Sequence, residues 1–341
     1  MGEVPTRLVL VTGGTGYVGS VLVPLVAQRY PVRVFCSMHF GNAIAGTPNV
    51  EFIKGDIQDP HALAAALLGV TDVIHLAGIV TDALVDMNQE MGMKVNQHAT
   101  GMLCRLALDA GVKRLLYASS SSVYGTTADP ATETTPVQPM TAYADSKLQG
   151  EMICLGWKDK MVVSAVRCAT CAGPAPRMRL DTIVNIFCKQ AYFDGKITVH
   201  GGSQYRSNVH VRDAAALYLH LLDAPAEKIN GQVFNLTREN MTAIGIAEKV
   251  QRALWETYAW GIPWETYAKE IPIEVDATKP DNRHYRMDAG NLKRVLGWEP
   301  VFSIWEAIMD NFRWFESGKL GDPNSSLYYN TERMKEVIKA G

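Results

Sequence analysis

A glycine-rich turn between a short apolar run and a helix-patterned segment constrains the fold of this chain most. The apolar run is 7–11, Thr12-Gly-Gly-Thr-Gly-Tyr-Val-Gly19 follows at once, and 20–29 carries apolar residues at helical spacing. The order of strand, tight turn and helix is typical of a dinucleotide-binding loop. An ordinary glycine turn would not need both flanking elements.

The glycines of this turn have separate tasks in such a loop. A side chain at Gly13 would obstruct the turn, one at Gly16 would keep the backbone from the pyrophosphate, and one at Gly19 would hold the helix off the sheet. Tyr17 and Val18 open the helix, where backbone N–H groups and the positive end of the helix dipole receive an anion. The sequence therefore predicts a cofactor site here.

Apolar strand-like runs alternate with helical segments over the first half of the chain. Strands are expected near 7–11, 32–36, 50–54, 72–76, 114–119 and 162–167, and helices near 17–29, 60–68, 94–110 and 142–156. This alternation predicts an α/β fold, a Rossmann-type doubly wound parallel sheet with ligands beyond the carboxyl ends of its strands. We expect an NAD(P)-binding domain over 1–172, to which 204–224 returns, and a smaller C-terminal α/β substrate domain over 173–341.

Composition excludes several classes of protein. A net charge of −2 over 341 residues shows no basic excess of the kind that nucleic-acid binding uses. No apolar run reaches the length of a membrane span, and the first apolar stretch is a strand, not a signal peptide. We expect a cytoplasmic protein that binds neither nucleic acid nor membrane.

Six cysteines are scattered along the chain, mostly within apolar stretches, and are expected to be reduced core residues. Cys168-x-x-Cys171 lacks a second ligand pair, and the histidines have no metal-ligand spacing. We therefore expect no metal site.

The strand ends supply further cofactor residues. An acid that selects NAD is expected about twenty positions past the glycine loop, but Cys36 and Ser37 stand there, and no arginine follows directly. The missing acid weakens an assignment to NAD alone, and without the arginine a 2′-phosphate has no obvious partner. The expected cofactor is NAD, with NADP as the alternative. Asp56 can accept a hydrogen bond from the adenine amine or act as a simple turn or helix-capping residue. The remaining expected cofactor contacts are Ile57, Leu76, Ala77 and Gly78.

Tyr143 and Lys147 lie four residues apart in an expected helix. This spacing puts both side chains on one face, where the ammonium favours the ionised phenol. The pair is a candidate acid/base couple, although such a pair is more often a solvated helix face. The run Ser119–Ser122 at the end of a strand offers a hydroxyl to hydrogen-bond the reacting oxygen, or is a flexible turn.

With these motifs in order, the chain resembles the extended short-chain dehydrogenase/reductase family, in its nucleotide-sugar epimerase/dehydratase branch. The resemblance rests on the glycine loop, Gly55-Asp56, His75-Leu-Ala, Asn96, Ser-Ser-Ser-Ser-Val-Tyr-Gly125, Tyr143 with Lys147, Arg167 to Gly173-Pro174, Arg206 to Asp213, and Asp281 to Tyr285. It implies that Tyr143 is the acid/base and that Lys147 activates it and anchors the ribose, so both also bind the cofactor. Ser120 is the implied hydroxyl partner, with Ser121 as competitor.

The resemblance also implies a nucleotide-diphosphate sugar as substrate. Arg206 and Arg283 would hold the diphosphate, since guanidinium suits that planar task, or else form surface salt bridges. The other implied substrate-binding residues are Ser121, Ser122, Thr170 and Asn185. Thr170 stands where many relatives have asparagine, which leaves the sugar open.

Ser121 and Ser122 replace the acids that dehydratases of the branch carry after the active hydroxyl, so dehydration is disfavoured. The sequence favours an NAD(P)-dependent epimerase that transiently oxidises C4 of the sugar. An NADPH-dependent 4-ketoreductase is the alternative, and a non-catalytic dinucleotide sensor is the second alternative.

Two features concern assembly. Helices 94–110 and 142–156 carry apolar faces that, in this family, pair into a homodimer; the alternative is packing on the sheet. The repeat of Trp-Glu-Thr-Tyr-Ala at 255–259 and 264–268 is interpreted as a lid or interface segment.

Overall fold

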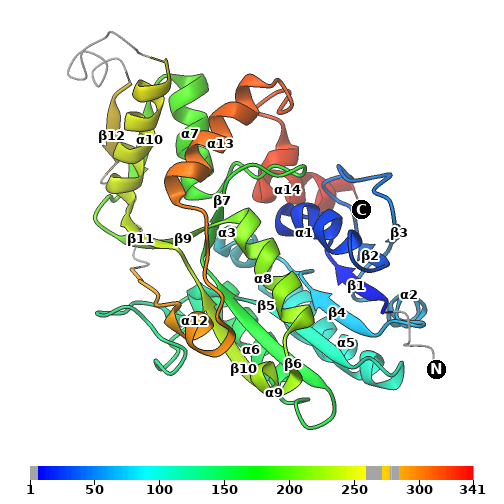
Figure 1. Ribbon diagram of the computed structural model, residues 1–341. Coiled ribbons are helices and arrows are strands. Elements are labelled where there is room, and N and C mark those ends of the chain that lie inside the picture. Colours follow the sequence, from blue (N-terminus) through cyan, green and yellow to red (C-terminus); the bar gives the residue numbers. More distant parts are fainter. Residues whose placement is uncertain (1–6, 259–270, 277, 279–283, 341) are drawn as a thin grey trace.

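The computed structural model describes residues 7–258, 271–276, 278 and 284–340. A seven-stranded parallel sheet with helices on both faces forms its larger part (Figure 1). The strand order is β10-β6-β5-β4-β1-β2-β3. The strands are β1 (Val9–Thr12), β2 (Val32–Cys36), β3 (Val50–Lys54), β4 (Asp72–His75), β5 (Arg114–Ser120), β6 (Val162–Cys168) and β10 (Gln232–Leu236).

The doubly wound sheet predicted from the sequence is confirmed, and so is every strand and helix expected between residues 7 and 167. The helices of this half are α1 (Tyr17–Ala27), α2 (Pro60–Ala66), α3 (Asp82–Met87), α4 (Gln89–Met93), α5 (Ala99–Asp109) and α6 (Ala142–Leu155). The helix expected from residue 94 begins with a π-helical turn, Lys94–His98, before α5.

Side-chain alternation along the strands divides the core between the two faces of the sheet. Val9 and Val11 pack into one hydrophobic cluster with α1 and α8 (Val211–Asp223), whereas Leu10 packs into another with α2, α5 and α6. Successive residues of a strand point to opposite faces, so a fully apolar strand fills both cores. This accounts for the continuous apolar runs in the sequence.

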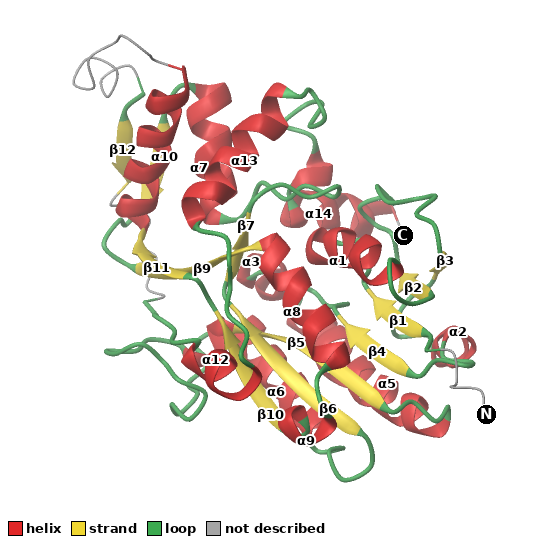
Figure 2. Ribbon diagram, viewed as in Figure 1, coloured by secondary structure: helices red, strands yellow, loops and turns green. Residues whose placement is uncertain are grey.

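A second unit stands above the carboxyl ends of the large sheet (Figure 2). A three-stranded sheet of order β11-β9-β7 and a two-stranded pair β12-β8 belong to it. Its strands are β7 (Thr170–Ala172), β8 (Ile197–His200), β9 (Tyr205–His210), β11 (Glu239–Thr242) and β12 (Ile273–Asp276). Its apolar core lies among α7 (Ile183–Lys189), α10 (Ala243–Tyr258) and α13 (Ile304–Glu316).

The return of the chain to the large sheet differs from the expected segment 204–224. β9 belongs to the small three-stranded sheet, whereas α8 packs in the core beside α1 and β10 adds the edge strand next to β6. The returning segment is therefore 211–236. The remaining helices are α9 (Ala226–Ile229), α12 (Gly290–Leu296) and α14 (Asn330–Ala340).

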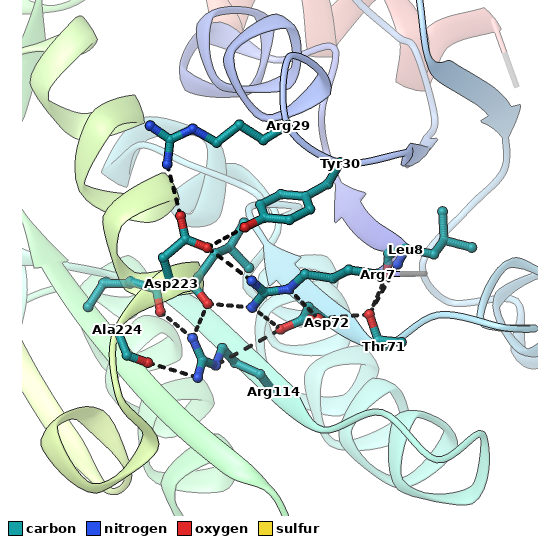
Figure 3. Close-up of polar contacts among 11 residues, drawn as sticks. Arg7, Leu8, Arg29, Tyr30, Thr71, Asp72, Arg114, Asp223 and Ala224 are labelled. Carbon is teal, nitrogen blue, oxygen red and sulfur yellow. Dashed lines mark hydrogen bonds and ion pairs between the residues drawn. The ribbon is translucent and has the colours of Figure 1, made fainter. Parts of the chain in front are cut away.

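A partly buried ion network joins α8 to the amino ends of β1, β4 and β5 (Figure 3). The Arg7 guanidinium donates to both carboxylate oxygens of Asp72, at 2.9 and 2.8 Å, and to Asp223 at 3.0 Å. Arg114 donates to the carbonyl oxygen of Ala224 at 2.9 Å, at the end of α8. The network lies at the end of the sheet opposite the strand ends that carry the cofactor motifs.

All six cysteines are free, and Cys104, Cys154, Cys171 and Cys188 are buried. Within the described ranges, no group of three histidine, cysteine or acidic side chains could hold a metal ion. A search of the same residues for a helix of sufficient length and apolarity to cross a membrane found none. Pairing of α5 and α6 with a second copy stays a prediction.

Candidate active site

The glycine-rich loop is shaped as the sequence predicts. Gly13 has a positive φ of +70°, and a Cβ there would lie 2.7 Å from the Ala77 backbone nitrogen. A Cβ on Gly19 would lie 2.6 Å from the Gly14 carbonyl oxygen, so glycine at this position allows the loop backbone to pack closely against α1. Only glycine fits at either position, and the first turn of α1 faces the cavity described below.

A cavity of about 1120 Å³ runs from this loop across the carboxyl ends of the strands to the second unit. Every predicted cofactor residue lines it: Gly13, Gly16, Tyr17, Val18, Gly19, Cys36, Ser37, Asp56, Ile57, Leu76, Ala77, Gly78, Tyr143 and Lys147. Pockets for one drug-sized ligand are typically about 300–1,000 Å³. The cavity is therefore large enough for a dinucleotide and a second ligand together.

The end of β2 carries no acid toward the cavity. Cys36 Sγ lies 3.1 Å from the Thr15 hydroxyl, so the thiol is tied to the glycine loop. Asp56 lines the cavity and also accepts a hydrogen bond from the Gln58 backbone N–H at 2.9 Å. The carboxylate thus has the predicted turn role and stays within reach of a ligand.

Helix α6 begins one residue before Tyr143 and presents the predicted pair to the cavity. Thr141 is its N-cap and accepts from the Ala144 N–H at 3.1 Å. Tyr143 and Lys147, one turn apart, both line the cavity, as does Ser120 at the end of β5, which lowers the pKa of Tyr143. The structure therefore brings Ser120, Tyr143 and Lys147 together, and their catalytic roles stay predictions.

Buried polar contacts fix α6 against β5 and β6. Ser119 donates to Glu151 at 2.6 Å, and Glu151 pairs with Arg167, also at 2.6 Å, with both side chains buried. Arg167 donates in turn to the Tyr124 hydroxyl at 2.9 Å. Because Glu151 lies one turn after Lys147, this network sets the rotation of the helix that carries the pair.

The π-helical turn before α5 also holds α6 in position, through contacts to the end of β4. Asn96 accepts from the Ile79 N–H at 2.8 Å and donates to the Ser146 hydroxyl at 3.0 Å, so it joins the end of β4 to α6. A Cβ on Gly78 would lie 2.8 Å from the Asn96 side-chain oxygen. π-Turns within helices often occur at functional sites.

The pKa values differ from those expected from the helical spacing alone. Burial raises the pKa of Tyr143 to about 12, while the Ser120 hydrogen bond and the Arg179 charge oppose that rise. Burial lowers the pKa of Lys147 to about 8, and its ammonium lies 4.4 Å from the centre of the Tyr117 ring. In the ligand-free protein the dominant effect on both groups is desolvation, which disfavours each charged form.

The predicted substrate residues divide into two groups. Ser121, Ser122, Thr170 and Arg206 line the cavity, and Arg206 is buried with its guanidinium 5.7 Å from the centre of the Tyr285 ring. Arg283 lies outside the described residues, as does the second copy of the Trp-Glu-Thr-Tyr-Ala repeat.

Asn185, expected to bind the substrate, does not line the cavity. The side chain is fully buried, accepts from the Gly173 N–H at 2.9 Å and donates to the Tyr17 hydroxyl at 2.9 Å. It also accepts from the Asn311 side chain at 2.9 Å. These hydrogen bonds join α7, which carries Asn185, to α1, to the loop after β7 and to α13. Both polar atoms of the side chain are thus bonded within the protein.

The sequence reading missed charged residues on the loop after β7 and on α3. Arg177, Arg179 and Asp181 line the cavity, and Arg179 donates to Asp181 at 2.5 Å. Asp82, in the first turn of α3, accepts from the Thr141 hydroxyl at 2.5 Å and raises the pKa of Tyr143. The Arg-x-Arg-x-Asp pattern after Gly173-Pro174 was the available signal in the sequence.

The family model of the NAD dependent epimerase/dehydratase family matches residues 9–237, from the first strand of the sheet to its last. The chain belongs to this family. The family is NAD dependent by description, in agreement with the dinucleotide expected from the glycine loop.

Known members are similar over nearly the whole chain. The UDP-glucose 4-epimerase of Lactobacillus helveticus is 29% identical, over 92% of this chain and 98% of the relative. The dTDP-D-glucose 4,6-dehydratase of Mus musculus is 24% identical, over 91% and 88%. The crystal structure of the Thermus thermophilus UDP-glucose 4-epimerase with NAD has a TM-score of 0.77 and 23% identity, over 90% of this chain and 99% of that one. The chain is thus an enzyme of the epimerase/dehydratase type.

Proposed function

We propose that the protein is an NAD-dependent nucleotide-sugar 4-epimerase. The observation that carries the proposal is the convergence of Ser120, Tyr143 and Lys147 on one cavity that the glycine loop also lines. Ser121 and Ser122 follow the active hydroxyl, where the dehydratases that the sequence resembles carry acids. The similarity to a UDP-glucose 4-epimerase over nearly the whole chain supports the same reaction.

NAD, held by the glycine loop and the strand ends that line the cavity, would supply the hydride acceptor for C4 of the sugar and the hydride that restores it. Tyr143 takes the proton of the C4 hydroxyl, and it returns a proton to the same oxygen once the 4-keto sugar has turned and received the hydride on its other face. Ser120 holds the phenol and the sugar oxygen in line. Because burial holds the pKa of Tyr143 at about 12, a positive charge beside the phenol is needed to favour its ionised form. Lys147 supplies such a charge, and its ammonium also suits a ribose hydroxyl.

The substrate's diphosphate lies, in this proposal, toward the second unit. Arg206 on β9 lines that part of the cavity together with Tyr285 and Gln204. A guanidinium can pair with two phosphate oxygens at once. Arg283 remains the proposed second cation, by resemblance alone.

The test is a panel of UDP-, GDP-, CDP- and dTDP-sugars incubated with the NAD-loaded protein, with and without NADPH. The products are read by mass spectrometry and proton NMR. We expect an isomer of unchanged mass without NADPH. A product lighter by one water molecule would identify a dehydratase, with Asp82 as the first acid to replace, and a product that requires NADPH would identify the ketoreductase. Absence of any conversion would favour the sensor.

Two tyrosine variants control this assay. Tyr143→Phe removes the proposed acid/base and should lower turnover by about 10²–10⁴ while NAD stays bound. Tyr192→Phe removes the same hydroxyl from an aromatic cluster of the second unit, outside the cavity, and should leave turnover unchanged.

A further inference from the structure

Arg177 is a buried cation on the loop after β7 that no step of the proposed reaction uses. Its side chain is 5% exposed, lines the cavity and has no ion pair among the described residues. Its backbone N–H donates to the Ser20 hydroxyl at 3.2 Å, which places the residue beside the first turn of α1. That turn is where a glycine-loop fold receives an anion.

The guanidinium is held in place on two sides. It lies 3.9 Å from the centre of the Phe40 ring, on the loop after β2, and its Nη2 donates to the Asn330 side chain at 2.5 Å. The Nε atom is buried and has no hydrogen-bond partner among the described residues. A fixed, buried donor without an acceptor is costly unless a ligand supplies one.

The charge around Arg177 also calls for an anion. Burial and the neighbouring Arg179 lower the pKa of Arg177 to about 9, against the attraction of Asp181. The Asp181 carboxylate is already engaged, since it accepts from Arg179 at 2.5 Å and from the Asn330 N–H at 2.9 Å. A phosphate suits the site because a guanidinium is the side chain best matched to phosphate oxygens.

Helix α14 closes the cavity on the same side. Asn330, Thr331, Met334, Val337 and Ile338 line the cavity that the glycine loop and the first turn of α1 also border (Figure 1). Arg333 donates to the backbone carbonyl of His39 at 2.7 Å, so α14 is tied to the loop that follows β2. The helix thus joins the two segments that face the adenosine half of a bound dinucleotide.

We propose that Arg177 and α14 form the outer wall of the cofactor site, where Arg177 Nε donates to a phosphate oxygen of the NAD pyrophosphate. Asn330 and Phe40 orient the guanidinium, and α14 slows release of the cofactor. This rests on NAD as the cofactor in the proposed function. It concerns cofactor binding and not turnover, so the two can fail separately.

The test measures bound NAD per subunit and the rate at which the NAD-loaded protein exchanges it for labelled NAD. Arg177→Met should accelerate exchange roughly ten- to a hundredfold, the equivalent of one hydrogen bond to a charged group. Asn330→Ala should accelerate it less, since it frees the guanidinium without removing it. Arg313→Met, at an exposed arginine of α13 paired with Asp310, is the matched control and should match wild type.

Titrations of the same variants separate the chemical sources of any effect. Arg177→Met should weaken binding of NAD and ADP but not of adenosine, which has no phosphate. Unchanged NAD exchange in Arg177→Met, with an unchanged unfolding temperature, overturns the proposal. Weakened NADP with unchanged NAD also overturns it, because the arginine would then contact a 2′-phosphate. If Arg177→Met fails to fold, Arg177→Lys and Asn330→Ala decide, and wild-type exchange rates in both overturn the proposal.

Discussion

The Ser120 hydroxyl, at the end of β5, lowers the pKa of the Tyr143 phenol near the start of α6, and both side chains line the cavity. Ser120 Oγ also accepts from the Ser122 hydroxyl at 2.8 Å and from the Ser122 N–H at 3.2 Å. This arrangement stabilises the phenolate and opposes the rise that burial causes in the pKa of Tyr143.

The first prediction separates Ser120 from its competitor Ser121. Ser120→Ala should lower turnover roughly ten- to a hundredfold, as expected for loss of a hydrogen bond to a charged group. It should also shift the ascending limb of the pH–activity profile, which ionisation of Tyr143 sets, to higher pH. Ser121→Ala should have little effect on either quantity. Steady-state kinetics across pH decides, and the opposite ranking would assign the hydroxyl partner to Ser121.

The second prediction concerns the pH dependence of stability set by Lys147. The folded-state pKa is about 8 and the ordinary value is 10.5, because burial disfavours the ammonium. Between these values the unfolded chain binds a proton that the folded protein does not, so stability rises with pH there. Wild type should therefore gain up to about 3 kcal/mol relative to Lys147→Met across this window.

Denaturant unfolding of the cofactor-free proteins at a series of pH values measures this difference. Below pH 8 and above pH 10.5 the two stability curves should run parallel. Parallel curves throughout would show that Lys147 keeps an ordinary pKa in the folded protein.

The third prediction concerns Arg206. Arg206→Ala should weaken nucleotide-sugar and free nucleoside diphosphate binding alike, roughly ten- to a hundredfold, and leave NAD binding unchanged. Arg212→Ala, at a half-exposed arginine outside the cavity, should bind both ligands like wild type. Calorimetric titration tests this, and a loss of NAD affinity with intact diphosphate affinity would reverse the positions given to cofactor and substrate. Arg177→Met is predicted to show that reverse pattern.

The fourth prediction concerns the ion network in Figure 3. Asp72 is buried and accepts two hydrogen bonds from Arg7, with Arg114 Nε 3.9 Å from its carboxylate. Asp72→Ala should lower the free energy of unfolding by about 3–5 kcal/mol, because it removes the buried carboxylate that faces both arginines and leaves Arg7 with Asp223 as its carboxylate partner. Glu299→Ala, which breaks an exposed pair with Lys293, should cost no more than about 1 kcal/mol. If the two variants lowered the free energy of unfolding equally, the ion network would contribute no more to stability than an exposed ion pair.

Local patterns were sufficient to predict the parallel sheet and the grouping of Ser120, Tyr143 and Lys147 at one cavity. β1 is apolar on both faces, and Gly13 has a positive φ that favours glycine. The strand and the turn can therefore be predicted from residues that are adjacent in the sequence. Tyr143 and Lys147 share a helix face by spacing alone. Their approach to Ser120 follows because the carboxyl ends of parallel strands meet at one edge.

Contacts between distant segments could not be predicted in the same way. Arg177 donates to Asn330, which lies 153 residues later in the sequence. No sequence pattern around either residue predicts this contact. Asn185 was expected at the substrate, but its side chain donates to Tyr17 and accepts from Asn311. Both partners are distant in the sequence, so these hydrogen bonds follow from the fold and could not be predicted from the residues around Asn185. The pKa values of Tyr143 and Lys147 depend on burial, which the helical spacing did not show.

The central claim is that hydride leaves and returns to the same sugar carbon. A nucleotide sugar deuterated at C4, converted by the NAD-loaded protein in ordinary water, tests it most directly by NMR and mass spectrometry. We predict a 4-epimer that keeps its deuterium at C4 and has the mass of the starting material. Deuterium found at another carbon, or a product that has lost water or its label, would contradict the proposed epimerase.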